Sequence, residues 1–136
     1  MIVADTNLIA YFSIYTEHST LAEAVCAVDP TWTAPLLWRS EYLATLMKYV
    51  KHAGMNFETA VSSLRVAEDV IAGREYAVDA RKVLELAIES KCSAYDCEYV
   101  ALAQDLGVPL VTADKQVLRA FPKIAVSLEK FSKKKK

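Results

Sequence analysis

The chain has 136 residues, of which 54% are hydrophobic and 24% are charged, a composition typical of one globular domain rather than of a disordered chain. Its net charge of −1 gives no overall basis for binding nucleic acid, so any basic surface must be local. Three cysteines without a Cys-x-x-Cys pair, together with two distant histidines, argue against a disulfide framework and against a zinc site.

Short apolar runs alternate with segments of helical spacing along the chain. The first run is followed by Asp5, one of the residue types that best cap a helix, and Gly54, Gly73 and Gly107 each end a helical segment. The expected elements are a strand at 2–4, a helix from about 7, a helix at 18–28, a strand at 31–34, helices at 36–52 and 57–71, a strand at 76–78, helices that run from the caps Asp79 and Ser93 to about 90 and 106, a strand at 108–112, a short helix from the cap Asp114 that stops before 122, and a strand at 124–126. In the helix at 36–52, the expected apolar stripe is Leu43, Leu46, Met47 and Val50.

This alternation predicts an α/β fold, a three-layer α/β/α sandwich around a mostly parallel five-stranded sheet. Residues 1–129 are expected to form the domain, and residues 130–136 a disordered basic tail. The tail lysines Lys133–Lys136 either attract a polyanion or keep the chain in solution, and the sequence does not rank the two. No signal peptide and no apolar run of ~20 residues is visible, so we expect a cytoplasmic protein without a membrane span.

Three aspartates lie where an open parallel sheet binds ligands, just beyond the carboxyl ends of its strands. Asp5 and Asp114 each follow a strand, and each is also explained as a helix cap. Asp96 completes a Ser-x-x-Asp capping pattern with Ser93. Asp96 also heads a helix stripe that should pack on the sheet, where a carboxylate is costly unless something pairs with it. The stripe consists of Tyr99, Val100 and Ala103.

Glu41 is the fourth acidic residue that can reach this edge, although an ordinary solvated glutamate explains its position equally well. Four carboxylates gathered in one crevice repel one another and resist ionisation, and a divalent cation resolves that conflict. Ligands that are all oxygen select Mg²⁺ or Mn²⁺. One or two such ions can activate water against a phosphodiester without a protein nucleophile. Neighbouring Arg39 would then contact phosphate or simply face solvent.

Four segments resemble the motifs of the PIN domain, and the VapC-type toxins are the most similar members. The segments are Val3-Ala4-Asp5-Thr6-Asn7, Trp38-Arg39-Ser40-Glu41, the run from Ser93 to Ala103 around Asp96, and Leu110-Val111-Thr112-Ala113-Asp114. The resemblance implies an endoribonuclease that cuts single-stranded RNA with one or two Mg²⁺ or Mn²⁺ ions. It places Asp5, Glu41, Asp96 and Asp114 at the metal and catalytic positions, supported by Thr6, Asn7 and Thr112. It also implies a toxin that forms a homodimer and is held inactive by a small antitoxin protein.

Three other interpretations are open. A receiver domain also combines such a sheet with an acidic Mg²⁺ site, but Asp5 has no acidic neighbour and no lysine follows the last strand at the required place. A catalytically silent PIN-like module would bind RNA or a protein without cutting. A plain α/β domain would use the acids only as caps, in which case Asp5→Asn and Asp96→Asn would cost about 0.5–2 kcal/mol of stability.

Overall fold

The computed structural model describes residues 1–134, in which helices alternate with five short strands. The strands are β1 (Ile2–Ala4), β2 (Trp32–Pro35), β3 (Glu75–Tyr76), β4 (Leu110–Val111) and β5 (Ala125–Val126). The helices are α1 (Thr6–Ser13), α2 (Ser19–Val28), α3 (Trp38–His52), α4 (Phe57–Ile71), α5 (Ala80–Glu89), α6 (Ala94–Leu106), α7 (Lys115–Ala120) and α8 (Leu128–Ser132).

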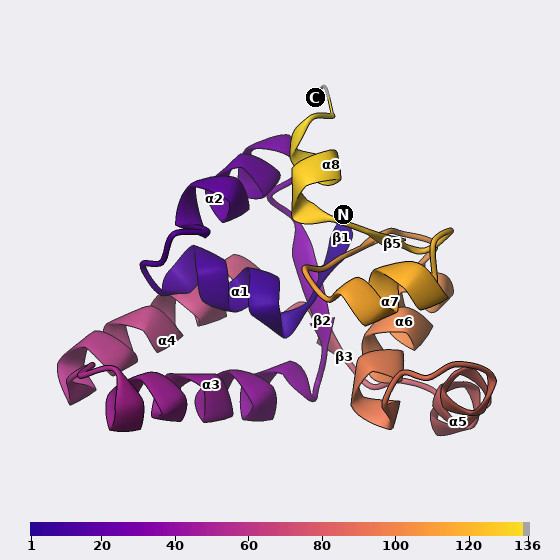
Figure 1. The fold of residues 1–136 in the computed structure, drawn as a ribbon, viewed down its shortest axis with the longest axis horizontal. Coiled ribbons are helices and arrows are strands. Elements are labelled where there is room, and N and C mark those ends of the chain that lie inside the picture. Colours follow the sequence, from indigo (N-terminus) through magenta and orange to yellow (C-terminus); the bar gives the residue numbers. More distant parts are fainter. Residues whose placement is uncertain (135–136) are drawn as a thin grey trace.

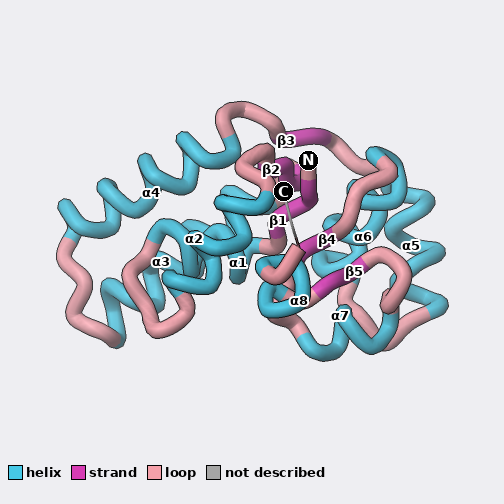
Figure 2. The backbone as a smooth tube through the Cα atoms, turned by 90° about the horizontal axis from the view of Figure 1, so that it is seen from above, coloured by secondary structure: helices cyan, strands magenta, loops and turns pink. Residues whose placement is uncertain are grey.

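The strands form one sheet in the order β3-β2-β1-β4-β5, and every neighbouring pair is parallel. Figures 1 and 2 show α1 to α4 on one side of this sheet and α5, α6 and α7 on the other. The predicted α/β sandwich is therefore confirmed, with a sheet that is wholly rather than mostly parallel. Because parallel strands all point the same way, the residues that follow β1 and β4 emerge at the same edge.

Four helices begin at the residues that the sequence predicted as caps. The side chains of Asp5, Asp79, Ser93 and Asp114 each accept a hydrogen bond from a backbone N–H in the first turn of the following helix, and Asn56 does the same for α4. Helix α6 ends at Gly107, whose φ of 66° is left-handed and suits glycine. These local signals explain why the predicted and observed helix bounds agree closely.

The predicted apolar stripe of α3 is wrong in part. Its buried residues are Trp38, Tyr42 and Leu46, whereas Leu43 and Met47 remain 43% and 46% exposed. The rings of Trp38 and Tyr42 lie one helical turn apart, with their centroids 5.9 Å from each other, and their burial places this face of α3 against the core. Leu43 and Met47 are thereby left on the outer side of the helix, whereas Leu46 is buried as predicted.

The predicted disordered tail at 130–136 is also wrong in part, because α8 includes residues 130–132. The buried side chains of Leu128 and Phe131 anchor this helix, which packs on α2. The Ser127 hydroxyl accepts a hydrogen bond of 3.1 Å from the Lys130 N–H and caps the helix. A domain boundary at residue 129 therefore cuts through a packed helix. Residues 135–136 of the predicted tail lie outside the described part of the chain.

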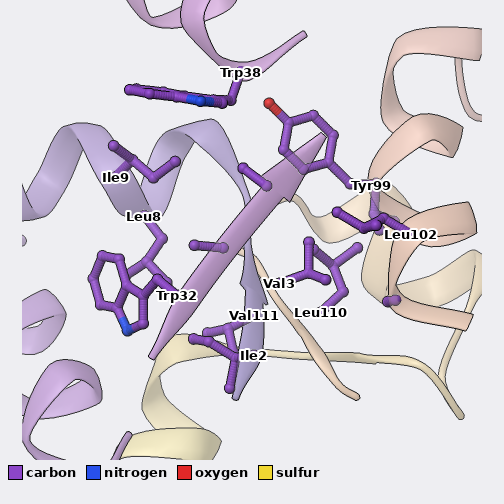
Figure 3. Packing of buried hydrophobic residues seen from close by; sticks show 14 of the residues in the cluster. Ile2, Val3, Leu8, Ile9, Trp32, Trp38, Tyr99, Leu102, Leu110 and Val111 are labelled. Atoms are coloured by element: carbon purple, nitrogen blue, oxygen red, sulfur yellow. The ribbon is translucent and has the colours of Figure 1, made fainter. Parts of the chain in front are cut away.

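The core lies between the sheet and its flanking helices. Figure 3 shows Val3 and Leu110 of the neighbouring strands β1 and β4 packed beside Leu102 of α6. The Tyr99 ring joins the same cluster, but its hydroxyl points away from Val3 and Leu110. Within residues 1–134, no helix has the length and apolar character needed to cross a bilayer.

Candidate active site

The four predicted acidic residues come from four separate segments that meet at the carboxyl edge of the sheet. Asp5 follows β1 and Asp114 follows β4, while Glu41 and Asp96 lie in the first turns of α3 and α6. All four line one cleft of about 410 Å³. The other residues that line it are Thr6, Asn7, Ala10, Tyr11, Ala44, Thr45, Lys48 and Tyr49. The structure thus brings together side chains that are up to 109 positions apart in the sequence (5 to 114).

Asp5 is the most buried of the four carboxylates, with 9% of its surface exposed. Its Oδ1 accepts a hydrogen bond of 2.7 Å from the Thr6 N–H, and its Oδ2 accepts one of 2.6 Å from the Thr112 hydroxyl. The pKa of Asp5 is raised to about 7, chiefly by burial and to a smaller extent by the charges of Asp96 and Glu41, while the two hydrogen bonds oppose the rise. Asp5 therefore keeps an ionisable carboxyl in a place that disfavours its charge.

Thr112 is the centre of the network that holds Asp5. Its oxygen accepts hydrogen bonds from the Asn7 Nδ2 at 3.3 Å and from the Asp114 N–H at 3.0 Å. Because a hydroxyl carries a single proton, these two donors direct that proton toward Asp5 Oδ2. The Asn7 Oδ1 also accepts a hydrogen bond of 3.2 Å from the Ala113 N–H. The predicted supporting residues Asn7 and Thr112 thus fix the position of one carboxylate oxygen.

Glu41 is held by two hydroxyl groups. The Thr6 and Tyr99 hydroxyls lie 3.0 and 2.7 Å from its Oε1 and are also in hydrogen-bond contact with each other, so their two protons serve two of these three contacts at a time. Burial raises the pKa of the Tyr99 phenol above its usual range, so this group remains a protonated donor. Neither hydroxyl uses the second carboxylate oxygen of Glu41. Thr6 belongs to both networks, because its backbone contacts Asp5 and its side chain contacts Glu41.

Asp96 and Asp114 combine capping with a place in the cleft. The Asp96 N–H donates to the Ser93 hydroxyl at 3.0 Å, which confirms the predicted cap of α6. Burial raises the pKa of Asp96, and the nearby charge of Asp114 raises it further. Asp114 caps α7 through Oδ1 alone, which accepts from the N–H groups of Gln116 and Val117 at 2.8 and 3.1 Å. The capping bonds therefore use the backbone N–H of Asp96 and only Oδ1 of Asp114, and they do not take up the remaining carboxylate oxygens of these residues.

Two further residues take part in the site without a prediction from the sequence: Tyr99, which contacts Glu41, and Lys48, which lines the cleft. The sequence places Tyr99 only in a buried stripe, and the need of a buried tyrosine hydroxyl for a partner is the signal that could have identified it. Lys48 shares a helix face with Glu41, Ala44 and Thr45, and their spacing of three, four and seven residues could have placed it in the cleft.

Arg39 does not take part in the cleft. Its guanidinium lies 2.6 Å from a carboxylate oxygen of Glu68 in α4 and 3.6 Å from one of Glu75 in β3. Arg39 does not simply face solvent, because these two ion pairs connect α3 to its neighbours. A contact with phosphate stays a prediction.

The donor set of the cleft fits a hard divalent cation in its chemistry. All four acids supply only oxygen, and none of them forms an ion pair with another residue in the described part of the chain. Among residues 1–134, no three Asp, Glu, His or Cys side chains are already gathered around one point as a complete metal cage. Mg²⁺ commonly retains several waters and binds one or two carboxylates. The arrangement therefore suits a largely hydrated ion better than one that the protein encloses.

Comparison with known proteins bears on the fold. A solved structure described as the crystal structure of PAE2754 from Pyrobaculum aerophilum matches the chain with a TM-score of 0.73 at 20% sequence identity. The match covers 96% of this chain and 92% of that one. No family model and no curated protein matches the chain. The structural match supports the α/β architecture, and at this identity it supports nothing finer.

Proposed function

We propose that this protein is a metal-dependent endoribonuclease that hydrolyses phosphodiester bonds in single-stranded RNA. The observation that carries the proposal is the convergence of Asp5, Glu41, Asp96 and Asp114 on one cleft without a paired cation within residues 1–134. Like charges in such a place are unfavourable unless a cation joins them, and burial of Asp5 increases that cost. A plain helix cap needs neither burial nor a shared cleft.

Mg²⁺ or Mn²⁺, as one or two ions, is the proposed cofactor, with the four carboxylates as its ligands or as acceptors for its waters. When bound, such an ion would polarise the phosphodiester and make water more acidic. Thr112 would hold Asp5 in one orientation, because its hydroxyl proton is directed to Asp5 Oδ2. Thr6 and Tyr99 would likewise hold Glu41 by Oε1, which leaves Oε2 to accept a proton from the attacking water.

Lys48 supplies the positive side chain in the wall of the cleft. Lys48 would contact a phosphate of the substrate, because its ammonium makes no ion pair with a carboxylate in the described part of the chain. The scissile phosphate would then lie between this ammonium and the carboxylates. Such positioning is how a site without a nucleophilic side chain lowers the barrier.

Cleavage of a labelled single-stranded RNA of mixed sequence tests the proposal. The parent chain should cut it in Mg²⁺ or Mn²⁺ and not in EDTA. Asp96→Asn and Asp114→Asn should each lower the rate by about 100-fold or more, the scale for losing one group that stabilises the reacting charges. Asp79→Asn is the matched control, since Asp79 also caps a helix but lies outside the cleft. Asparagine caps as well as aspartate, so a capping role alone predicts equal rates for all three variants.

Two outcomes would contradict the proposal in different ways. A parent chain that binds RNA and Mg²⁺ without cutting would be a silent binding module. A cleaving chain whose Asp96→Asn and Asp114→Asn variants retain the parent rate would have its active site elsewhere.

We also propose that the protein is the toxin of a toxin–antitoxin pair and acts as a homodimer under control of a small antitoxin. The resemblance of the motifs supports this, and so does the surface of α3 and α4. Leu43 and Met47 of α3 and Phe57 and Val66 of α4 are each more than 40% exposed, and exposed apolar groups favour a protein partner. Sedimentation equilibrium of the purified chain should give twice the mass of the monomer. A monomer at all concentrations would contradict the dimer.

A further inference from the structure

The charges of this chain are strongly divided along the sequence. Residues 115–136 hold eight of the 16 lysines and arginines but one of the 17 acidic residues, Glu129. Residues 1–114 hold the other eight basic and 16 acidic residues. The overall charge of −1 therefore combines a segment of about +7 with a segment of about −8. A nearly neutral protein thus carries one region with the charge of a polyanion-binding surface.

The structure gathers the described part of this segment on consecutive elements, α7, β5 and α8, which Figure 1 shows in orange to yellow. The cationic tract, as we name it, consists of the exposed side chains of Lys115, Arg119, Lys123, Lys130, Lys133 and Lys134. Lys123 and Lys134 line two hollows of about 460 and 380 Å³ beside β5, and Lys130 lines the larger one. The ammonium of Lys134 lies 5.1 Å from the centre of the Phe131 ring, which keeps it near α8.

Within residues 1–134, these cations lack carboxylate partners. Among the described residues, none of the six forms an ion pair with a carboxylate. A group of like charges without counter-ions is electrostatically unfavourable and favours an external polyanion. Exposed lysines contribute most of their binding energy through the release of counter-ions from that polyanion.

The neighbourhood of the tract favours nucleic acid over a lipid surface. Membrane-surface binding combines basic residues with apolar side chains that enter the interface. No large hydrophobic side chain of residues 107–134 is exposed, so the tract offers no such anchor. Phosphate contacts to a nucleic-acid backbone need only the charges.

Helix α7 connects the tract with the carboxylate cleft. Its cap is Asp114, which lines the cleft, and the next residue is Lys115, the first member of the tract. Lys115 and Arg119 are four residues apart and therefore lie on one face of α7. A strand that passes along this face would leave the cleft and meet cations.

We propose that the cationic tract binds the phosphodiester backbone of single-stranded RNA and directs the strand along α7 into the cleft. This inference rests on the proposed nuclease function for the fate of the strand, whereas the binding itself needs no cleavage. The contacts are to phosphates, so the tract contributes affinity without sequence preference.

The test measures binding of a fluorescent 20-nucleotide RNA by anisotropy in EDTA, at KCl concentrations from 50 to 200 mM. The variant Lys123→Gln/Lys130→Gln/Lys134→Gln removes three cations of the tract. The matched control, Lys51→Gln/Arg65→Gln/Arg81→Gln, removes three exposed cations from α3, α4 and α5 and changes the net charge equally. All six positions are exposed, so neither variant disturbs the core.

We expect the slope of log affinity against log salt to fall by about 2 in the tract variant, because each lost contact with a single strand removes about 0.7. Its affinity should therefore decline ~20-fold less than that of the parent over this fourfold range of salt. The control should keep the parent slope. Equal slopes for the tract variant and the parent would overturn the inference, and so would an equal reduction in the control, which would mean that only net charge matters.

Vesicles of phosphatidylserine and phosphatidylcholine provide the second arm. Parent binding to them that is tighter than binding to RNA, and that is lost in the tract variant, would assign the tract to a membrane surface and overturn the proposal. EDTA prevents metal-dependent cleavage, so the assay measures RNA binding alone. The slope of log affinity against log salt therefore tests the tract even if the chain has no ribonuclease activity. Failure of the tract and failure of the nuclease proposal are therefore distinguishable.

Discussion

Asp5→Asn removes the most strongly desolvated charge of the cleft, and we expect it to change how the stability of the metal-free protein depends on pH. In the folded chain, burial raises the pKa of Asp5 from 3.8 to about 7. Below about pH 4 the carboxyl is protonated in the folded and unfolded states alike. Between about pH 4 and pH 7 the unfolded chain releases its proton first, so the folded state loses stability as the pH rises. The loss is complete once the pH exceeds the folded pKa.

The size of this effect follows from the difference between the two pKa values. At 1.36 kcal/mol for each pKa unit, a rise from 3.8 to about 7 corresponds to roughly 4 kcal/mol. This is a large share of the ~5–15 kcal/mol that stabilises a typical domain. The amide introduced by Asp5→Asn cannot ionise, so the contribution of this position to the pH dependence should vanish. The stability of Asp5→Asn relative to the parent should therefore increase by about 4 kcal/mol between pH 4 and pH 8.

Urea unfolding in EDTA, followed by circular dichroism across this pH range, measures the effect. The comparison uses the change with pH rather than the absolute difference, so altered hydrogen bonds that do not depend on pH cancel. Adding Mg²⁺ at pH 8 should then stabilise the parent, by about 2.7 kcal/mol at 100 times its Kd, and stabilise Asp5→Asn much less. Parallel pH profiles would show that Asp5 is not desolvated, and equal stabilisation by Mg²⁺ would place the ion away from Asp5.

Two further predictions concern the network and the cell. Thr112→Val leaves Asp5 Oδ2, the Asn7 amide and the Asp114 N–H without their shared partner, so it should lower the free energy of unfolding in urea by about 1–3 kcal/mol and also lower RNA cleavage. Thr112→Ser keeps the hydroxyl and should retain both stability and cleavage. Equal behaviour of the two variants would show that the hydroxyl has no such role. Expression of the chain alone should slow cell growth, measured as optical density. Asp5→Asn should abolish this effect and Asp79→Asn should preserve it. Growth inhibition that persists in Asp5→Asn would argue against the proposed toxin function.

The sequence was most informative where local chemistry decides the structure. Asp79, Ser93 and Asp114 were predicted as helix caps from residue type alone, and their side chains bond to the expected first turns. Apolar strands followed by helices predicted the sandwich, because only a few layer arrangements bury such elements. The order β3-β2-β1-β4-β5 was not predicted, since strand pairing depends on contacts between distant segments.

Errors arose where tertiary packing outweighs local pattern. In α3 the aromatic face of Trp38 and Tyr42 took the core position that aliphatic spacing had assigned to Leu43 and Met47. At the C-terminus the lysines suggested disorder, although Phe131 packs inside the protein and holds α8. In both cases a large buried ring contributes more than the composition around it, because the free energy of burial grows with apolar area.

The site itself followed the same division. Residue type and position after strands placed the four acids at one edge, because parallel topology makes that edge common to all of them. Their partners could not be derived in this way. Tyr99 contacts Glu41 across 58 positions and Thr112 contacts Asp5 across 107, so these contacts depend on the register of the folded chain.

The strongest argument against a purely structural role for these acids comes from comparing two caps. Asp79 is an exposed cap, so its charge faces water. Asp5 accepts one cap bond from the Thr6 N–H, which asparagine or serine would accept equally well, yet it carries a buried second oxygen near two other carboxylates. A capping role alone does not explain why the fold keeps that unfavourable charge at neutral pH. A bound divalent cation reverses the sign of the interaction, since the same carboxylate becomes stabilised once a positive charge occupies the cleft. The pH profile in EDTA and its change on adding Mg²⁺ therefore separate a cap from a ligand at a single residue.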